Sequence, residues 1–209
     1  MKDLIAQAGL RERKKARTRA SLREHALRLF REQGYQATTV EQIAAAAEVS
    51  PSTFFRYFPT KEDVVLQDDM DIRMMEALAR QPRELAPIPA VRAAMRETWN
   101  SFSPGEWEQL REGGRLSMEV PEIRARTMNE FSRLINAFAE AIAGRTDHSP
   151  DDVRVRVLAG AIIGVMMSVF LPEHLQAEAG ADLDKNSFGP ESVPRIDEAL
   201  ALLEEGLPL

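Results

Sequence analysis

Cysteine is absent from the 209 residues of this sequence, which excludes disulfide bonds and metal sites built on thiolates. Histidine is scarce as well: His25, His148 and His174 are far apart, and no two of them stand at a metal-ligand spacing. The longest apolar stretch without a charge covers residues 157–171, which is shorter than the ~20 residues that a membrane-spanning helix needs. We therefore expect no metal site and no contact with a membrane.

Catalytic signatures are missing too. The sequence shows no glycine-rich phosphate loop and no nucleophile elbow. Its first residues, MKDLIAQAGLRERKK, lack the apolar run of a secretory signal, so we expect a cytoplasmic protein. These absences predict a protein without catalytic residues and without a cofactor. An enzyme is the alternative from another functional class, and the sequence offers it little support.

Charge is divided unevenly along the chain. The net charge is −6, but residues 1–66 hold twelve Lys and Arg against eight Asp and Glu, a net charge of +4. Nine basic residues fall within residues 11–31, where the acidic residues are Glu12 and Glu24. A concentration of basic side chains at one end is expected if that end meets a polyanion such as DNA. A solvated helix face explains the same run, so charge alone leaves both interpretations open.

Helix signals run through the whole sequence, whereas the alternation of a strand and the turns of a hairpin are nearly absent. One apolar stripe predicts a first helix over residues 11–33, followed by Gly34 where a left-handed C-terminal cap would fall. The stripe consists of Leu22, Ala26, Leu29 and Phe30. In all we expect an all-α fold of about nine helices.

Two short helices are expected after this first one. Thr39 and Gln42 form a capping box, in which each side chain satisfies the other residue's backbone N–H. Ser50 then provides an N-cap, and Pro51 takes the first position of a helix that reaches about residue 57. A longer helix is expected from Lys61. Two short helices braced by a longer helix before them form a helix-turn-helix pattern.

Longer helices are expected beyond residue 80. Residues 81–89 contain three prolines and predict a loop, and residues 177–190 predict another. Three helices are expected between these loops: one from a capping box at residues 103–106, one from Pro121 to Gly144, and a very apolar one over residues 149–171. The last helix carries a seam suited to packing against another helix, made of Val193, Ile196, Leu200, Leu203 and Leu207.

Residues 17–65 resemble the DNA-binding domain of the TetR family of transcriptional regulators. The resemblance depends on the order and spacing of several elements and covers roughly a quarter of the chain. These elements are Phe30, Gly34-Tyr35, Thr38-Thr39-Val40, Ile43-Ala44, Val49-Ser50, the run from Phe54 to Phe58, and Lys61-Glu62. The resemblance implies an N-terminal three-helix DNA-binding domain over residues 1–66. It also implies a helical ligand-binding and dimerisation domain over residues 67–209.

The resemblance implies that a homodimer binds a palindromic double-stranded DNA operator, with repression as the family default. Arg56 is the candidate for reading a base, although neutralising a phosphate explains the same residue, and Tyr57 and Lys61 match positions that contact phosphate. Ser52 stands where the family often has glycine, and Phe55 where tyrosine is common, so no operator sequence can be carried over. The residues expected at DNA are Lys14, Lys15, Arg17, Thr39, Ser50, Pro51, Ser52, Thr53, Arg56, Tyr57 and Lys61.

The resemblance further implies dimerisation through the last two helices and a small-molecule effector between the central helices. Residues 116–126 are similar to members that sense acyl-CoA-like or other apolar ligands. Methionine and aromatic side chains make adaptable apolar walls, although plain core packing explains the same residues. The candidate ligand contacts are Met95, Trp99, Phe102, Met118, Met128, Phe131, Phe138, Met166, Met167 and Phe170. Candidates to meet an acidic head group are Arg92, Arg96, Arg124 and Arg126.

A second alternative is a DNA-binding protein that senses no ligand, or one that is controlled by a protein partner. Such a protein would be expected to fill its central core tightly, whereas a ligand sensor would keep a cavity there. The sequence does not distinguish the two.

Overall fold

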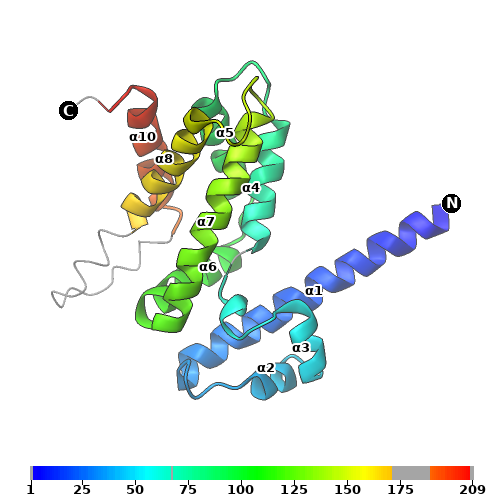
Figure 1. The fold of residues 1–209 in the computed structure, drawn as a ribbon. Coiled ribbons are helices and arrows are strands. Elements are labelled where there is room, and N and C mark those ends of the chain that lie inside the picture. The colour runs from blue at the N-terminus through cyan, green and yellow to red at the C-terminus, as the bar shows by residue number, and fades with distance from the viewer. Residues whose placement is uncertain (1, 67, 171–188, 208–209) are drawn as a thin grey trace.

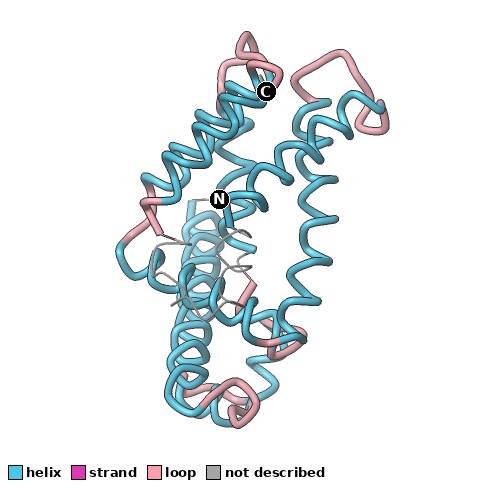
Figure 2. The backbone as a smooth tube through the Cα atoms, turned by 90° about the vertical axis from the view of Figure 1, so that its left-hand side faces the viewer, coloured by secondary structure: helices cyan, strands magenta, loops and turns pink. Residues whose placement is uncertain are grey.

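The computed structural model describes residues 2–66, 68–170 and 189–207. Within these ranges the chain forms nine α-helices and one 3-10 helix and no strand, as Figure 2 shows, so the predicted all-α fold is confirmed. An N-terminal domain comprises α1 (Lys2–Gln33), α2 (Val40–Ala46), α3 (Pro51–Tyr57) and η1 (Glu62–Val64). A C-terminal domain comprises α4 (Asp68–Arg80), α5 (Pro87–Asn100), α6 (Pro104–Glu119), α7 (Pro121–Ala143), α8 (Val153–Phe170) and α10 (Ser192–Glu204).

Helix α1 is longer than the sequence predicts. It begins at Lys2 instead of about residue 11, because residues 2–10 contain good helix formers and no proline that would stop it. Its N-terminal half projects from the body of the molecule, and its C-terminal half packs across the N-terminal domain (Figure 1). The helix ends where expected, since Gly34 takes a left-handed conformation (φ +85°) and its N–H donates to the Phe30 carbonyl at 3.0 Å.

The caps of the two short helices form as predicted. The Gln42 side chain accepts from the backbone N–H of Thr39 at 2.9 Å, and the Gln42 N–H donates to the Thr39 hydroxyl at 3.3 Å. Ser50 caps α3 by accepting from the N–H of Thr53 at 3.1 Å. The turn between these helices places Glu48 at a φ of +55°, which is rare for a residue other than glycine.

The predicted helix from Lys61 is wrong in its first part. A 3-10 turn, η1, stands there, and α4 begins at Asp68. Val64, Val65 and Leu66 are all buried, and three consecutive residues cannot share one face of an α-helix. A tighter turn allows the chain to bury all three.

Three other helix ends differ from prediction. Helix α5 begins at Pro87, inside the expected loop, because the first turn of a helix needs no proline N–H. Helix α10 ends at Glu204, so Leu207 is not part of its seam: Gly206 (φ +86°) and Leu207 (φ +53°) terminate the helix. Helix α8 begins at Val153, a few residues later than expected. The loop expected over residues 177–190 and the position of His174 lie almost wholly outside the described residues.

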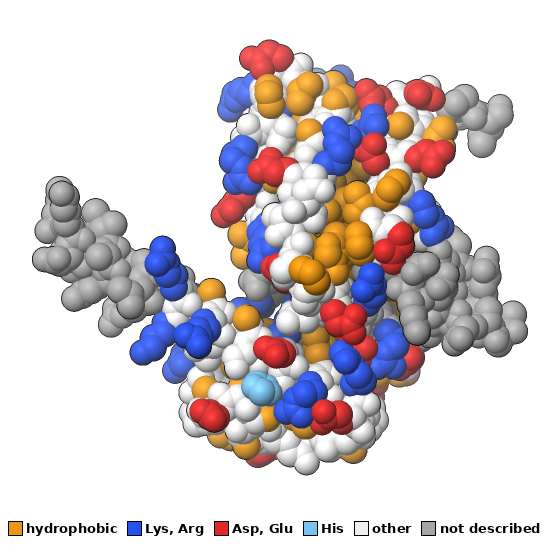
Figure 3. Space-filling model, turned by 180° about the vertical axis from the view of Figure 1, so that it is seen from behind, with side chains coloured by type: hydrophobic (Ala, Val, Ile, Leu, Met, Phe, Trp, Pro, Cys, Tyr) orange, Lys and Arg blue, Asp and Glu red, His pale blue; other side chains and the backbone are white. Residues whose placement is uncertain are grey.

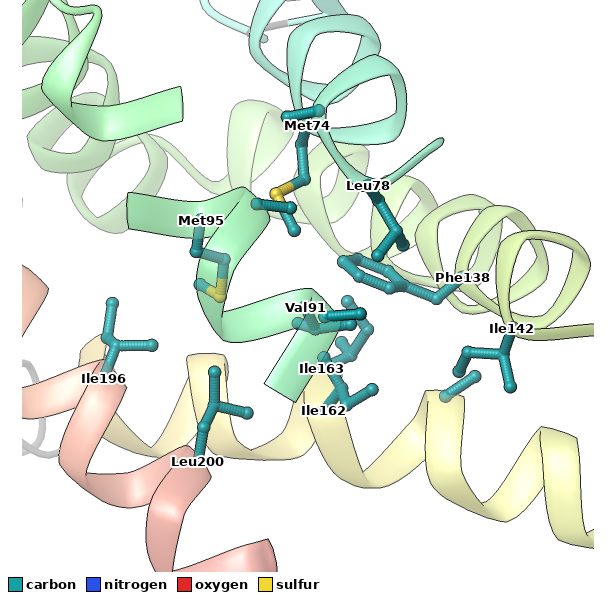
Figure 4. Packing of buried hydrophobic residues seen from close by; sticks show 14 of the residues in the cluster. Met74, Leu78, Val91, Met95, Phe138, Ile142, Ile162, Ile163, Ile196 and Leu200 are labelled. Carbon is teal, nitrogen blue, oxygen red and sulfur yellow. The ribbon is translucent and has the colours of Figure 1, made fainter. Parts of the chain in front are cut away.

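Two apolar clusters hold the molecule together. The larger one unites α4, α5, α7, α8 and α10, whose side chains converge in Figure 4, with Phe138, Ile162, Ile196 and Leu200 fully buried. The smaller cluster is the core of the N-terminal domain, but it also includes Leu116 of α6 and Ile123 of α7. Leu116 and Ile123 of the C-terminal domain are therefore buried in the core of the N-terminal domain, and the two domains are in apolar contact.

Candidate nucleic-acid interface and internal cavity

The first turn of α3 presents a cluster of hydroxyl groups. The Ser50 hydroxyl lies 2.8 Å from that of Ser52 and 3.0 Å from that of Thr53. Ser50, Pro51 and Ser52 are exposed, and Thr53 is half-buried. Exposed hydroxyls at the start of a helix are suited to hydrogen bonding with phosphate oxygens or base edges.

Helix α3 is anchored from beneath by aromatic rings. Phe54 and Phe58 are fully buried, with ring centroids 5.7 Å apart. Their burial leaves Phe55 and Arg56 exposed on the outer face. The Arg56 guanidinium lies over the ring of Tyr57, 5.2 Å from its centroid, so Arg56 is oriented while its donors stay open to solvent.

Basic side chains extend this face along α1. Lys14, Lys15 and Arg17 are exposed on the projecting half of the helix. Figure 3 shows Lys and Arg side chains gathered where this projection joins the N-terminal domain. The exposed hydroxyls and the basic residues therefore belong to the same domain, while Thr39 is used in the capping box of α2.

Lys61 has a structural role that the sequence does not predict. Its ammonium group donates to the backbone carbonyls of Tyr35 at 2.9 Å and Thr38 at 3.0 Å, and it lies 3.9 Å from the centroid of the Tyr35 ring. Burial lowers the pKa of Lys61 from its ordinary value. Lys61 therefore ties η1 to the loop between α1 and α2.

Beside this contact, the hydroxyl of Tyr35 donates to the carboxylate of Glu62. Burial raises the pKa of Tyr35, and the bond to Glu62 raises it further. The pair fixes the same corner of the N-terminal domain from a second direction.

A cavity of about 190 Å³ lies inside the C-terminal domain, between α4, α5, α6 and α7, with contributions from α8 and α10. It exceeds the roughly 150 Å³ that accommodates a benzene-sized guest in a protein core. Five of the residues expected at a ligand line it: Met95, Trp99, Phe131, Phe138 and Met166.

Four of the other expected residues do not line this cavity. Phe102 packs on Trp107, with ring centroids 5.0 Å apart, and Met167 packs against the main core. Met118 is half-buried elsewhere, and Met128 is 39% exposed. The side chain of Phe170, at the end of α8, falls outside the described residues.

Several wall residues were missed from the sequence. Met70, Met74 and Met75 come from α4, where the four-residue spacing of Met70 and Met74 is a helical signal. Trp107, in the first half of α6, is separated from the expected set by a loop and gave no comparable signal.

The four arginines proposed for an acidic head group are used elsewhere. Arg92 pairs with Asp197 and Glu204, both at 3.0 Å, and Arg96 pairs with Asp197 at 2.8 Å. The guanidinium of Arg126 bonds Asp63 at 2.8 Å. Arg124 donates to the backbone carbonyl of Met118. None of the four lines the cavity as far as its wall is described.

One buried arginine links the cavity to the N-terminal domain. Arg23 of α1, only 6% exposed, donates to the carbonyls of Val65 and Leu66, each at 2.8 Å. Val65 and Leu66 also line the cavity, as does Gly113 of α6. A Cβ atom at Gly113 would stand 3.2 Å from the Val65 carbonyl oxygen, so α6 lies directly against the segment that Arg23 holds.

Within the described part of the chain there is neither a candidate metal site nor a candidate membrane-spanning helix. No group of three or more His, Asp and Glu residues there could hold a metal ion. No helix there is long and apolar enough to cross a membrane.

Comparison with known proteins assigns both domains. Residues 22–67 match the family model of bacterial regulatory proteins of the tetR family, and residues 85–208 match that of the MftR C-terminal domain. The HTH-type transcriptional regulator TcmR of Streptomyces glaucescens is 36% identical over 193 residues, which cover 88% of this chain and 84% of TcmR.

Solved structures agree with this assignment. The repressor FadR of Thermus thermophilus, crystallised with lauroyl-CoA, is 25% identical, with a TM-score of 0.51, over 91% of this chain and 95% of FadR. A regulator from Syntrophomonas wolfei shares the fold, with a TM-score of 0.61 at 20% identity over 93% of this chain and 98% of that one. This chain belongs to the TetR family of transcriptional regulators, the family that its helix-turn-helix predicts.

Proposed function

We propose that the protein is a repressor that binds a palindromic operator as a homodimer and is released by a small apolar or amphipathic molecule. The observation that carries this proposal is that Val65 and Leu66 belong both to the cavity wall and to the segment that Arg23 holds. Both residues line the internal cavity, and their carbonyls are held by Arg23 of the N-terminal domain. A molecule that enters the cavity therefore meets the segment that positions α1.

The DNA contacts follow from the geometry of α1 and α3. Exposed Arg56 reads a base edge, since a guanidinium can bond guanine through two hydrogen bonds. Ser50, Ser52 and Thr53 offer hydroxyls to phosphates or bases, while Pro51 and Tyr57 complete the outer surface of α3. Lys14, Lys15 and Arg17 neutralise phosphates along the projecting half of α1, and the helix capped by Thr39 supports the interface.

Lys61 contributes to DNA binding chiefly through the fold. Its contacts with the Tyr35 and Thr38 carbonyls hold the corner that carries the helix-turn-helix. We retain a phosphate contact as a second task, because an ammonium group has three donors and two of them are used here.

The dimer forms through α8 and α10. Val153 and Val157 are 71% and 65% exposed, which is unusual for valines on such an apolar helix. Gly160 and Gly164 continue their face of α8, and open space surrounds both glycines. The seam of α10 points the other way, because Ile196 and Leu200 are fully buried in the chain's own core. The α10 contribution therefore comes from its outer face, which exposes Leu202.

Family membership alone does not define the chemical class of the effector. FadR was crystallised with lauroyl-CoA, and an acyl-CoA-like molecule is one option for this chain. The presence of a cavity supports a ligand sensor over a regulator with a filled core. We expect no enzymatic activity, because both matched family models and the relative TcmR are those of transcriptional regulators.

Random-sequence DNA selection with the full-length protein tests this proposal. We expect a palindrome whose half-sites lie about one helical turn, 34–36 Å, apart. In parallel, Val157→Asp should convert the dimer to a monomer in light scattering, whereas Ile72→Asp, at an exposed position of α4, should not. Recovery of no enriched sequence would refute DNA recognition, and a dimer that survives Val157→Asp would refute the proposed interface.

A further inference from the structure

One wall of the cavity carries a carboxylate in an unexpected place. Helix α7 lines the cavity with Thr127, Phe131, Leu134 and Phe138, at the spacings that keep side chains on one face of a helix. Glu130 stands within this stripe, and only 14% of its side chain is exposed. A charged group is costly to place among apolar side chains, so its position there calls for a compensating partner.

The partner that Glu130 has within the chain lies outside the cavity wall. Arg133 pairs with it at 2.8 Å, but 73% of the Arg133 side chain is exposed. Its positive charge is therefore screened by water, while Glu130 itself is among the residues that line the cavity. Helix α4 adds Asp71 to the wall, among its methionines.

The neutral polar groups of the wall also act as acceptors. Each hydroxyl donates its proton to a backbone carbonyl: Thr98 to Ala94 at 2.8 Å, Ser117 to Gly113 at 2.9 Å, Thr127 to Ile123 at 3.0 Å and Ser192 to Gly189 at 2.7 Å. With these protons engaged, and with the Thr127 hydroxyl also 3.2 Å from that of Ser117, the hydroxyls offer a ligand chiefly oxygen lone pairs. Among the lining residues, Trp99 and Trp107 carry N–H donors, and both are neutral.

Positive charge is missing from the wall in the part of it that the structure describes, where no residue is Lys, Arg or His. The faces of Trp99, Trp107, Phe131 and Phe138 carry partial negative charge and attract cations. Carboxylates, hydroxyl lone pairs and aromatic faces thus all favour the same sign of charge on a ligand.

We propose that the cavity takes an apolar aromatic cation, a molecule with one or a few rings and a positively charged nitrogen, and rejects anionic ligands. This inference rests on the proposed ligand-sensing function and specifies the class of effector. A cavity volume of about 190 Å³ accommodates a substituted ring. An acyl-CoA would bring phosphates to a wall whose described residues include no Lys, Arg or His.

Three probes of nearly equal shape test the charge preference: phenyltrimethylammonium, neutral tert-butylbenzene and anionic benzenesulfonate. Trp99 and Trp107 are the two tryptophans of the chain, and both line the cavity, so intrinsic fluorescence reports on this site directly. Binding to the full-length dimer would be followed by tryptophan fluorescence and confirmed by calorimetry. The variant is Glu130→Gln, and the matched control is Glu76→Gln, at an exposed position of α4.

We expect the cation to bind at least about tenfold more tightly than the anion, the scale of one cation–π or charge contact. Glu130→Gln should weaken the cation several-fold and leave tert-butylbenzene unchanged, and Glu76→Gln should change neither. Equal binding of all three probes would overturn the charge preference and leave the cavity a ligand site. If none binds although the protein still forms its operator complex, both the charge preference and the sensing function of this cavity are refuted, while DNA recognition stands.

Discussion

The guanidinium of Arg23 donates a hydrogen bond of 2.8 Å to the carbonyl of Val65, across 42 residues of sequence. A second bond of the same length reaches the carbonyl of Leu66. Both carbonyls belong to the short segment between η1 and α4, so this one buried side chain fixes the connection between the two domains.

Replacing Arg23 should therefore cost stability. Arg23→Met leaves the Val65 and Leu66 carbonyls buried without their donor, and we expect the free energy of unfolding to fall by about 2–4 kcal/mol. Denaturant titration measures this change. The matched control is Arg28→Met on the same helix, where an exposed pair with Glu32 should be worth less than about 0.5 kcal/mol. Equal losses in the two variants would mean that the buried bonds do not hold the segment.

Gly113→Ala should disturb the same segment from the side of α6. The new Cβ atom would stand 3.2 Å from the Val65 carbonyl oxygen, and backbone must move to admit it. We expect operator affinity to fall about tenfold without any ligand, because an overpacked contact typically costs 1–3 kcal/mol. Fluorescence anisotropy on labelled operator measures this effect.

The control for that variant is Gly105→Ala in the same helix, where nothing lies within 4 Å of the added atom. Both changes replace glycine by alanine in α6, and of the two only Gly113→Ala brings an atom against the Val65 carbonyl. If the two variants bind the operator equally well, α6 does not communicate with the N-terminal domain through this contact.

Substitutions of Arg56 and Lys61 should affect operator binding and protein stability differently. Arg56→Ala should leave the unfolding free energy within about 0.5 kcal/mol, because the side chain is exposed, and weaken operator binding by ~1–3 kcal/mol. Lys61→Ala should instead lower the unfolding free energy by about 1–3 kcal/mol, since the Tyr35 and Thr38 carbonyls lose their donor. Thermal and denaturant unfolding, with anisotropy, distinguish the two. A Lys61→Ala protein of unchanged stability would contradict the structural task.

Asp197 should make stability depend on acid pH. Its bonds with Arg92, then the charges of Arg92 and Arg96, lower the pKa of this carboxyl from its ordinary value. A carboxyl with a lowered folded-state pKa contributes stability above its unfolded pKa of about 3.9, and this contribution is lost as the pH falls through the folded value.

Asp197→Asn measures that contribution. The variant should be less stable than the parent by about 1–2 kcal/mol at neutral pH, and the gap should close as the pH falls toward 3. Denaturant unfolding across this range gives the gap directly, and a gap that stays constant would show that the carboxylate charge is not what joins α5 to α10.

The sequence predicts those features that depend on local chemistry. The caps at Thr39, Ser50 and Gly34 involve neighbouring residues only, so the sequence predicts them directly. The order of motifs around Phe54 to Phe58 predicted the family. The 3-10 turn at Val64 could not be read, because it forms to bury three consecutive side chains against helices that are distant in sequence.

The same division applies to the candidate sites. Exposure of Arg56 follows from the helical period, whereas the task of Lys61 depends on the carbonyls of Tyr35 and Thr38, more than twenty residues away. Half of the expected ligand contacts line the cavity. Met128 and Phe102 do not line it, because apolar spacing along the chain does not show which neighbour a side chain meets. The side chain of Phe170 lies outside the described residues.

A titration of the selected operator, with a scrambled DNA of equal length beside it, tests the central claim most directly. Affinities would be measured by anisotropy at about 50 mM and 200 mM salt, because counterion release makes phosphate contacts salt-dependent. Our account predicts that the dimer binds the operator at least about a thousandfold more tightly than the scrambled DNA, and that salt weakens both complexes steeply. Equal affinity for the two DNAs, or no complex even at the lower salt concentration, would contradict it.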